Sequence, residues 1–255
     1  MLRRAGLSDR ARNARHLLST TITKAVLLAA GRGTRMRELT NELPKPMIAV
    51  RGKPILQHII EGLHAAGVEQ FLIVVGYRAE VVRDFLGDGA RCGVAISYTT
   101  QMVQDGTGKV VELARDFVGD DAFVLSYGDV IVDPPNYERL VRLEEECAAI
   151  VSVIRDQDVR QGGAVFVNER FELIDLREKP QPGEPTSPWY NAGVYAFRPG
   201  IFEFTARLER SPRGEFELTD AIRDLARSGQ KVQALELTGA WADVRDPEIL
   251  AQLNR

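Results

Sequence analysis

Cysteine and histidine are scarce in this sequence. Two cysteines and three histidines occur among 255 residues, and neither Cys92 nor Cys147 belongs to a Cys-x-x-Cys pair or lies near a histidine. We therefore expect no zinc site, and we interpret both cysteines as reduced thiols in the core. His58 and His64 fall within one amphipathic segment, where a structural position is the usual one, so catalysis by histidine is not expected.

The sequence also lacks a basic excess and a long apolar segment near its start. Its net charge of −3 and pI of about 5.8 give no reason to expect a nucleic-acid partner, because proteins that coat nucleic acids usually carry many more basic than acidic residues. Residues 1–21 contain several arginines but no continuous apolar block, which argues against a secretory signal or a membrane span. We expect a cytoplasmic protein with no membrane partner and a poorly ordered N-terminal extension over residues 1–23.

Residues 24–255 have the composition of one globular domain, since 44% of the chain is hydrophobic and 27% is charged. In its first half, predominantly apolar runs alternate with segments of helical spacing. Runs of this kind are typical of parallel strands that are buried on both faces. The runs are 25–30, 71–75, 94–98 and 123–126, and the helical segments are 55–63, 81–85 and 110–114. The pattern predicts an α/β fold with a mostly parallel sheet, helices on both of its faces, and ligands at the carboxyl ends of the strands.

Beyond residue 150 the pattern changes to short strands separated by polar turns. Strands are predicted at 164–167, 171–176 and 193–197, helices at 201–208 and 217–226, and a strand at 232–235 before a short helix after Pro247. We expect this smaller, mixed β half to shape the pocket of a second substrate within the same domain.

Two familiar glycine signatures are incomplete here. The segment 31–36 resembles a dinucleotide fingerprint, but Met36 stands where the third glycine belongs. Gly108 and Lys109 are followed by Val110 rather than by serine or threonine, and Val103 occupies the place of the first phosphate-loop glycine. A dehydrogenase and a P-loop NTPase are therefore both disfavoured.

The segments 28–36 and 43–47 together resemble the signature of sugar-phosphate nucleotidyltransferases, most closely the glucose-1-phosphate thymidylyl- and uridylyltransferases, and the similarity runs from about Lys24 to Glu248. Small residues let the main chain approach a triphosphate, and Arg35 and Lys45 bring two positive charges to it. Glu38 departs from the family's proline. The resemblance implies catalytic roles for Arg35 and Lys45 and a Rossmann-like fold. It implies nucleotide contacts for Leu28, Ala29, Ala30, Gly31, Arg32, Gly33, Thr34, Arg35 and Lys45.

A second nucleotide element is indicated by Gln101, Gly106 and Thr107, whose spacing resembles the base-reading turn of the family. Glutamine offers both a donor and an acceptor to the edge of a pyrimidine, and glycine permits close approach of the base. This favours UTP or dTTP over a guanosine nucleotide. Lys109 departs from the small residue or histidine that is common at its position.

The candidate metal ligands are two aspartates. Asp129 follows a buried strand and a glycine, and the resemblance assigns it a catalytic role and, with Asp243, the binding of Mg²⁺, which needs few protein carboxylates. Arg245 and Asp246 replace the glycine and threonine that are usual beside this second aspartate. Asp133 also follows the strand, but a turn or cap explains it.

The acceptor side is indicated by short motifs in the mixed β half. In the family, the lysine of a Glu-Lys-Pro segment holds the acceptor phosphate and the glutamate holds sugar hydroxyls, while small residues border the sugar. The resemblance accordingly implies substrate contacts for Gly163, Glu178, Lys179, Asn191 and Gly193.

These features predict an enzyme that joins a nucleoside triphosphate, UTP or dTTP favoured, to a phosphorylated acceptor, glucose 1-phosphate favoured, with release of pyrophosphate and with Mg²⁺ as cofactor. Two alternatives stay open. One is a CTP- or GTP-dependent relative acting on phosphocholine, a phosphonate or a mannose- or heptose-type phosphate. The other is a non-catalytic subunit that binds nucleotide sugars. A homo-oligomer is possible in each case.

Overall fold

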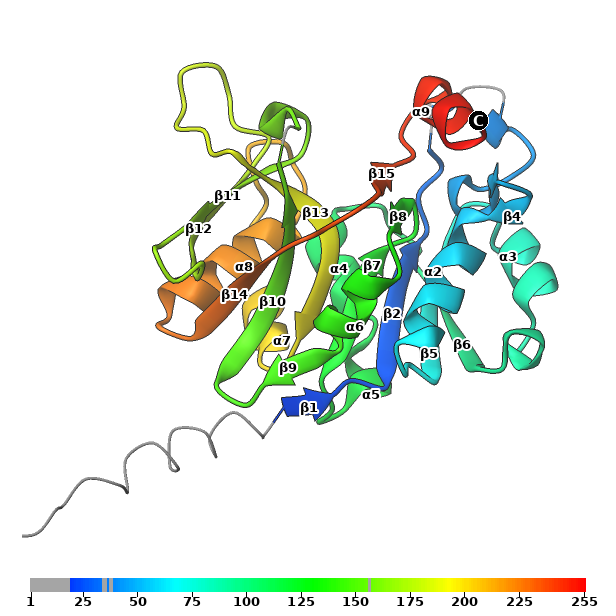
Figure 1. Cartoon of the computed structure of the whole chain (residues 1–255), viewed down its shortest axis with the longest axis horizontal. Helices are drawn as coiled ribbons and strands as arrows, with labels where there is room; N and C mark the ends of the chain where they lie inside the picture. Colours follow the sequence, from blue (N-terminus) through cyan, green and yellow to red (C-terminus); the bar gives the residue numbers. More distant parts are fainter. Residues whose placement is uncertain (1–18, 34–35, 37–38, 156) are drawn as a thin grey trace, which may run out of the picture.

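The computed structural model describes residues 19–33, 36, 39–155 and 157–255, and one nine-stranded sheet forms its centre (Figure 1). Seven strands follow the order β12-β11-β13-β7-β2-β5-β6, while β10 pairs with both β13 and β14. Their bounds are β2 (Lys24–Ala29), β5 (Gln70–Val75), β6 (Ala95–Thr100), β7 (Phe123–Tyr127), β10 (Cys147–Ile154), β11 (Gly163–Val167), β12 (Leu173–Glu178), β13 (Trp189–Phe197) and β14 (Lys231–Glu236).

The two halves of the sheet differ in strand direction. Strand β2 runs parallel to both β5 and β7, and β5 runs parallel to β6. Strand β13 is antiparallel to β7, to β10 and to β11, and β11 is antiparallel to β12. The predicted α/β fold, with a mostly parallel sheet and a smaller mixed β half, is confirmed.

Helices cover both faces of the sheet. Helices α2, α3 and α6 pack on one face, and α4, α7 and α8 pack on the other. The helices are α2 (Ile55–Ala65), α3 (Ala79–Leu86), α4 (Thr107–Glu112), α5 (Arg115–Val118), α6 (Pro135–Leu140), α7 (Ile201–Ala206), α8 (Leu218–Arg227) and α9 (Pro247–Leu253), with short 3₁₀ turns η3 (Lys45–Met47), η4 (Ala90–Cys92) and η5 (Val159–Gln161).

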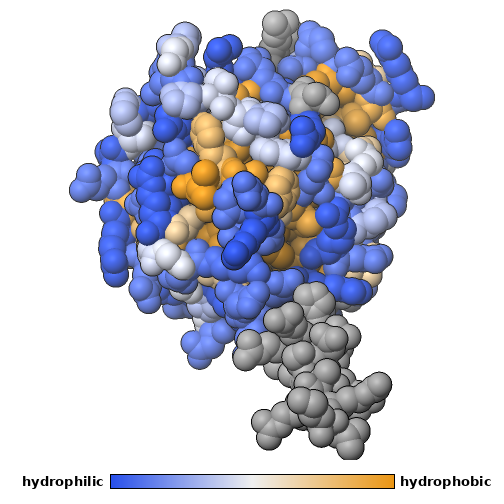
Figure 2. Space-filling model, turned by 60° about the vertical axis from the view of Figure 1, so that its left-hand side comes forward, coloured by the Kyte–Doolittle hydropathy of each residue, from blue (hydrophilic) through white to orange (hydrophobic). Residues whose placement is uncertain are grey.

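The continuous apolar run of β2 is explained by this double covering. Leu27 points into one core cluster and Val26 into the other, and both side chains are fully buried. Each such side chain contributes about 1.5–3 kcal/mol to folding, so neither face of this strand tolerates a polar residue. The outer surface is mostly hydrophilic around a smaller apolar area on the side shown in Figure 2.

The described part of the chain begins with strand β1 (Ser19–Thr21), which pairs antiparallel with β9 (Arg142–Glu144). Ile22 follows it and is fully buried in the core. The last residues of the expected extension, 19–23, are thus built into the domain, and residues 1–18 lie outside the described part. No helix among the described residues is long and apolar enough to cross a membrane.

Two further strand pairs flank the carboxyl end of the central strands. Strand β8 (Val130–Val132) pairs antiparallel with β15 (Trp241–Asp243), and in this register Asp243 lies opposite Val130. Strands β3 (Ala49–Val50) and β4 (Lys53–Pro54) form a short hairpin. The β8–β15 pair brings the end of the chain to the residues that follow β7.

Candidate functional site

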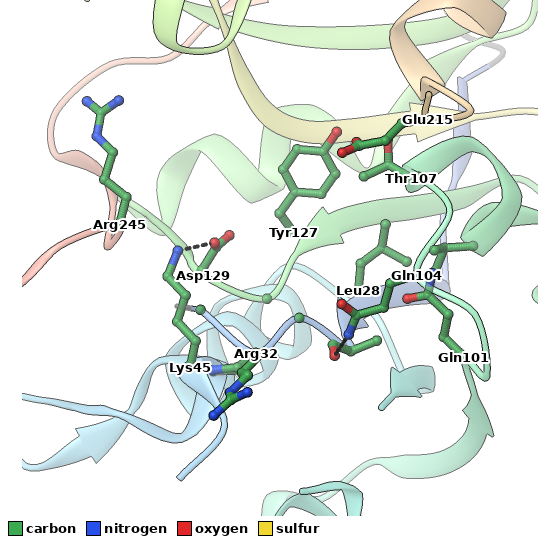
Figure 3. A pocket seen from close by; sticks show the side chains of 17 residues that line it. Leu28, Arg32, Lys45, Gln101, Gln104, Thr107, Tyr127, Asp129, Glu215 and Arg245 are labelled. Atoms are coloured by element: carbon green, nitrogen blue, oxygen red, sulfur yellow. Dashed lines mark hydrogen bonds and ion pairs between the residues drawn. The ribbon is translucent and has the colours of Figure 1, made fainter. Parts of the chain in front are cut away.

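Two cavities meet at the carboxyl ends of β2 and β7. The nucleotide cavity, as we call the first, has a volume of about 530 Å³. Among the residues predicted to bind a nucleotide, it is lined by Leu28, Ala30, Gly31, Arg32, Gly33, Lys45, Gln101, Gly106 and Thr107, and Asp129 also lines it (Figure 3). The acceptor cavity, of about 260 Å³, is lined by Gly163, Glu178, Lys179, Asn191, Gly193, Asp129 and Asp243. The structure therefore gathers most of the predicted residues around one connected space.

One of the predicted nucleotide contacts lies elsewhere, and two fall outside the described residues. Ala29 does not line the nucleotide cavity, because its side chain is 1% exposed and packs in the core between the strands. Thr34 and Arg35 lie outside the described residues. Their assignment stays a prediction from the sequence.

The glycine loop after β2 makes room for Lys45. Gly33 has a φ of +69°, and a Cβ at this position would lie 2.7 Å from the Cβ of Lys45. Lys45 begins the turn η3, whose proline at position 46 fixes the backbone next to it. The lysine is only 8% exposed. Its ammonium group is thereby held at the bottom of the cavity rather than in solvent.

Lys45 contacts both predicted metal ligands. Its Nζ forms an ion pair with Asp129 (Figure 3) and lies 3.6 Å from Oδ1 of Asp243. The amide of Val244 donates to the carbonyl of Asp129 at 3.0 Å, which ties the end of β15 to the end of β7. The two carboxylates thus face one cation between the two cavities.

These two carboxylates fit a hard divalent cation. Magnesium prefers oxygen ligands and usually takes only one or two from protein carboxylates, with phosphate and water completing its shell. No group of three or more His, Cys, Asp or Glu side chains with metal-ligand geometry exists among the described residues. The arrangement therefore suits a metal that arrives with a phosphorylated ligand better than a metal caged by the protein alone.

The far end of the nucleotide cavity carries two glutamines. Gln101 donates from Nε2 to the carbonyl of Val103 at 2.8 Å, and Gln104 donates to the carbonyl of Ala30 at 3.2 Å. Gln104 was not predicted as a site residue from the sequence, although it lies in the same turn as Gln101 and Gly106. Both side chains face the space beside Leu28 (Figure 3).

The acceptor cavity contains charged residues that sequence reasoning missed. Arg213 forms ion pairs with Glu217 at 3.0 Å, with Glu178 at 3.5 Å and with Glu215 at 3.7 Å. Burial raises the pKa of Glu178, and the neighbouring Glu217 carboxylate adds to that rise. Burial likewise raises the pKa of Glu217. No periodicity marks this polar segment, so only its position in the fold identifies it.

Asn191 lines the same cavity and is largely buried. Its Nδ2 donates to the hydroxyl of Tyr195 at 2.7 Å. The side chain is 8% exposed, and no described residue hydrogen-bonds to its buried Oδ1. A buried acceptor of this kind favours a ligand with a hydroxyl or amine donor.

Tyr127 lies where the two cavities join. It was not predicted as a site residue from the sequence either. It lines both cavities, together with Thr107, Asp129 and Glu215. Gly193, with a φ of +81°, lies under its ring, because a Cβ there would come within 2.8 Å of the Tyr127 Cδ2 atom. Burial raises the pKa of Tyr127 well above its ordinary value. Its hydroxyl therefore stays protonated and can donate a hydrogen bond.

A clamp, formed by residues 105–108 and 215–218, connects the two sides of the site. The amide of Phe216 donates to Asp105 O, and the amide of Gly108 donates to Phe216 O, both at 2.8 Å. Thr107 Oγ1 accepts from the amide of Leu218 at 3.2 Å. The turn that borders the nucleotide cavity is thus fastened to the segment that carries Arg213.

The sequence of this chain is similar to those of known proteins. Residues 24–255 match a family model described as nucleotidyl transferase. The UTP–glucose-1-phosphate uridylyltransferase AglF of Haloferax volcanii is 36% identical over 228 residues, which cover 88% of this chain and 92% of AglF. The bifunctional protein GlmU of Methanocaldococcus jannaschii is 37% identical over 231 residues, which cover 91% of this chain and 53% of GlmU.

A solved structure has the same fold. It is a Bacillus anthracis protein named as a glucose-1-phosphate thymidylyltransferase, which superposes with a TM-score of 0.81 at 28% identity over 91% of this chain and 93% of that chain. The chain spans only 53–65% of the length of the first three curated relatives it matches.

Proposed function

Because this chain belongs to the nucleotidyl transferase family, we propose that it transfers a nucleotidyl group from UTP or dTTP to a sugar 1-phosphate, with glucose 1-phosphate favoured, and releases pyrophosphate. The observation that carries the proposal is the position of Asp129, Asp243 and Lys45 where the nucleotide and acceptor cavities meet. A phosphate from each substrate would come together there.

The chemical step is an in-line displacement at the α-phosphorus. An oxygen of the acceptor phosphate attacks, a new P–O bond forms, and the bond to the β-phosphate breaks as pyrophosphate leaves from the opposite side. Such transfers are catalysed mainly by positioning and charge compensation, so few acid–base groups are needed.

Each charged residue then has a distinct role. Lys45 and Arg35 stabilise the charge on the α-phosphate and the leaving group, and Lys179 with Arg213 orients the acceptor phosphate. Asp129 and Asp243 would hold Mg²⁺, which supplies positive charge to the phosphoryl oxygens when it is bound. Asn191 and Glu178 accept hydrogen bonds from sugar hydroxyls.

The preference for a pyrimidine rests on Gln101 and Gln104. Both amides face the cavity end opposite Lys45, and an amide can pair with the donor and the acceptor of a pyrimidine edge. Relatives of this chain include a uridylyltransferase and a thymidylyltransferase by name. These points support UTP or dTTP over CTP or GTP.

The proposal is tested by pyrophosphate release with Mg²⁺ across UTP, dTTP, CTP, GTP and ATP. Each nucleotide is combined with glucose, mannose and N-acetylglucosamine 1-phosphates and with phosphocholine. We expect the highest kcat/KM with UTP or dTTP and glucose 1-phosphate. Tight nucleotide-sugar binding without pyrophosphate release from any pair would contradict the catalytic proposal and favour a binding subunit.

A further inference from the structure

Arg245 is a positively charged residue in the wall of the nucleotide cavity. It follows β15 by two residues, its side chain is half-buried, and it lines the nucleotide cavity beside Lys45 and Asp129. The family resemblance leads us to expect a glycine at this place. A long cationic side chain thus stands two residues after Asp243 in this chain, and its amide donates to the backbone carbonyl of Asp243 at 2.8 Å.

Among the described residues, the side-chain partner of the Arg245 guanidinium is neutral. Its Nη1 donates to Oε1 of Gln161 at 3.1 Å, and none of the ion pairs between described residues includes it. By contrast, Lys45 faces two carboxylates and Arg213 faces three. The charge of Arg245 is therefore available to an anion without breaking an existing ion pair.

The direction of the side chain indicates which phosphate it meets. The guanidinium points away from Lys45 and lies on the other side of Asp129 from Gln101 and Gln104 (Figure 3). Its partner Gln161 lines the acceptor cavity, not the nucleotide cavity. Arg245 itself lines the nucleotide cavity and not the acceptor cavity, but its guanidinium is hydrogen-bonded to a residue that lines the acceptor cavity.

In-line geometry separates the two candidate anions. The attacking phosphate and the leaving pyrophosphate occupy opposite sides of the α-phosphorus, so a cation on the acceptor side serves the attacking group. We infer that Arg245 is a positioning residue that moves from Gln161 onto the acceptor's phosphate and holds it against the α-phosphate. This inference rests on the proposed transferase function and concerns its acceptor specificity.

The expected signature is a change confined to the acceptor. Loss of a hydrogen bond between charged groups weakens binding by about tenfold or more. Arg245→Gln, measured with the substrate pair selected by the pyrophosphate assay, should raise the KM of the acceptor by about tenfold and leave the KM of the nucleotide within twofold. Arg245→Lys should retain part of the acceptor affinity, because the charge is kept but the fork of donors is lost.

Gln161→Ala is the matched control. If the Arg245–Gln161 bond served only to join the two segments, Arg245→Gln and Gln161→Ala would have the same effect. We expect instead that Gln161→Ala leaves the acceptor KM unchanged or lowers it, since the guanidinium is released from its neutral partner. The salt dependence of the acceptor KM should also weaken in Arg245→Gln and persist in Gln161→Ala.

Two outcomes would overturn the inference while the proposed function stands. In the first, the wild type is active and Arg245→Gln has the same acceptor KM as the wild type. In the second, Arg245→Gln raises only the KM of the nucleotide. If the wild type itself releases no pyrophosphate with any pair, the proposed function fails first. In that case, direct titration of the protein with glucose 1-phosphate compares wild type with Arg245→Gln, and equal affinities count against the inference.

Discussion

At the scale of single residues, the site is a small set of charges placed where two cavities meet. Asp129 is brought there by β7 and Asp243 by β15, and Lys45 reaches both from the turn η3. Neutralising one member should therefore change chemistry more than it changes folding. Three predictions test the charges at this scale.

The first prediction concerns Asp129→Asn. This change removes a negative charge and almost no volume, so we expect kcat to fall by about 10²–10³-fold with little change in the melting temperature. Asp133→Asn is the control, because Asp133 lies just beyond the site and its carbonyl accepts from the amide of Asn136 at 3.0 Å. Full activity in Asp129→Asn would remove this residue from the mechanism.

The second prediction concerns competition between Lys45 and a metal ion. The ammonium occupies the space between the two carboxylates, so free Mn²⁺ should bind the wild type weakly. Lys45→Met keeps the length of the side chain and removes its charge, and it should bind free Mn²⁺ roughly tenfold more tightly by electron paramagnetic resonance titration. Asp243→Asn in the same background should cancel the gain. Equal Mn²⁺ affinity in wild type and Lys45→Met would show that the two cations do not compete.

The third prediction concerns pH. Burial raises the pKa of Glu178 above the ordinary value of 4.5, so the folded state binds its proton more tightly than the unfolded state. Its contribution to stability is therefore largest at low pH and is lost as the pH rises from about 4.5 through the raised pKa. In Glu178→Gln, the fall in melting temperature over this window should become shallower.

Glu61 is the opposite case and serves as the control. A hydrogen bond from Lys53 lowers the pKa of its exposed carboxyl below 4.5, so its contribution is present at higher pH and is lost as the pH falls through the lowered value. Glu61→Gln should therefore leave the slope above pH 4.5 unchanged. A parallel change of slope in both variants would contradict the assignment to Glu178.

At the scale of elements, the clamp between residues 105–108 and 215–218 depends on a glycine. Gly106 has a φ of +118°, and a Cβ there would lie 2.5 Å from the amide nitrogen of Phe216. Gly106→Ala should lower the free energy of unfolding by about 1–3 kcal/mol and raise the KM of the nucleotide. Gly119→Ala is the matched control, because Gly119 also has a positive φ, of +59°, but has open space around it. Chemical denaturation gives the free energy of unfolding of both variants. Gly119→Ala reports the cost of backbone strain alone, and Gly106→Ala reports that strain together with the steric clash against Phe216.

The elements also differ in how well the sequence predicts them. The apolar runs of β2 and β7 predicted buried parallel strands, and the family resemblance of the segments after them predicted Lys45 and Asp129 at one site. Strand β15 has three half-exposed residues, which carry no detectable alternation. Arg213 and Glu215 lie in a polar loop. This loop is positioned by the hydrogen bonds between Phe216 and the turn at residues 105–108, which is far from it in the sequence. Such residues are found only when the tertiary fold brings the segments together.

At the scale of the whole molecule, one continuous sheet supports both cavities. Strand β7 belongs to the parallel half, and its neighbour β13 belongs to the mixed half. Nucleotide binding should therefore stabilise the entire domain rather than one part of it. At a hundred times its Kd, a ligand adds about 2.7 kcal/mol, which raises the melting temperature of a domain of this size by roughly 5–10 °C. Calorimetry should show one transition that moves as a unit, and two separating transitions would contradict this.

The clamp has a consequence for how the two substrates influence each other. The turn beside the nucleotide and the segment bearing Arg213 share two backbone hydrogen bonds, so ordering one lowers the entropic cost of ordering the other. Thermodynamic linkage makes this coupling reciprocal. The factor by which bound nucleotide raises the affinity for the acceptor equals the factor by which bound acceptor raises the affinity for the nucleotide.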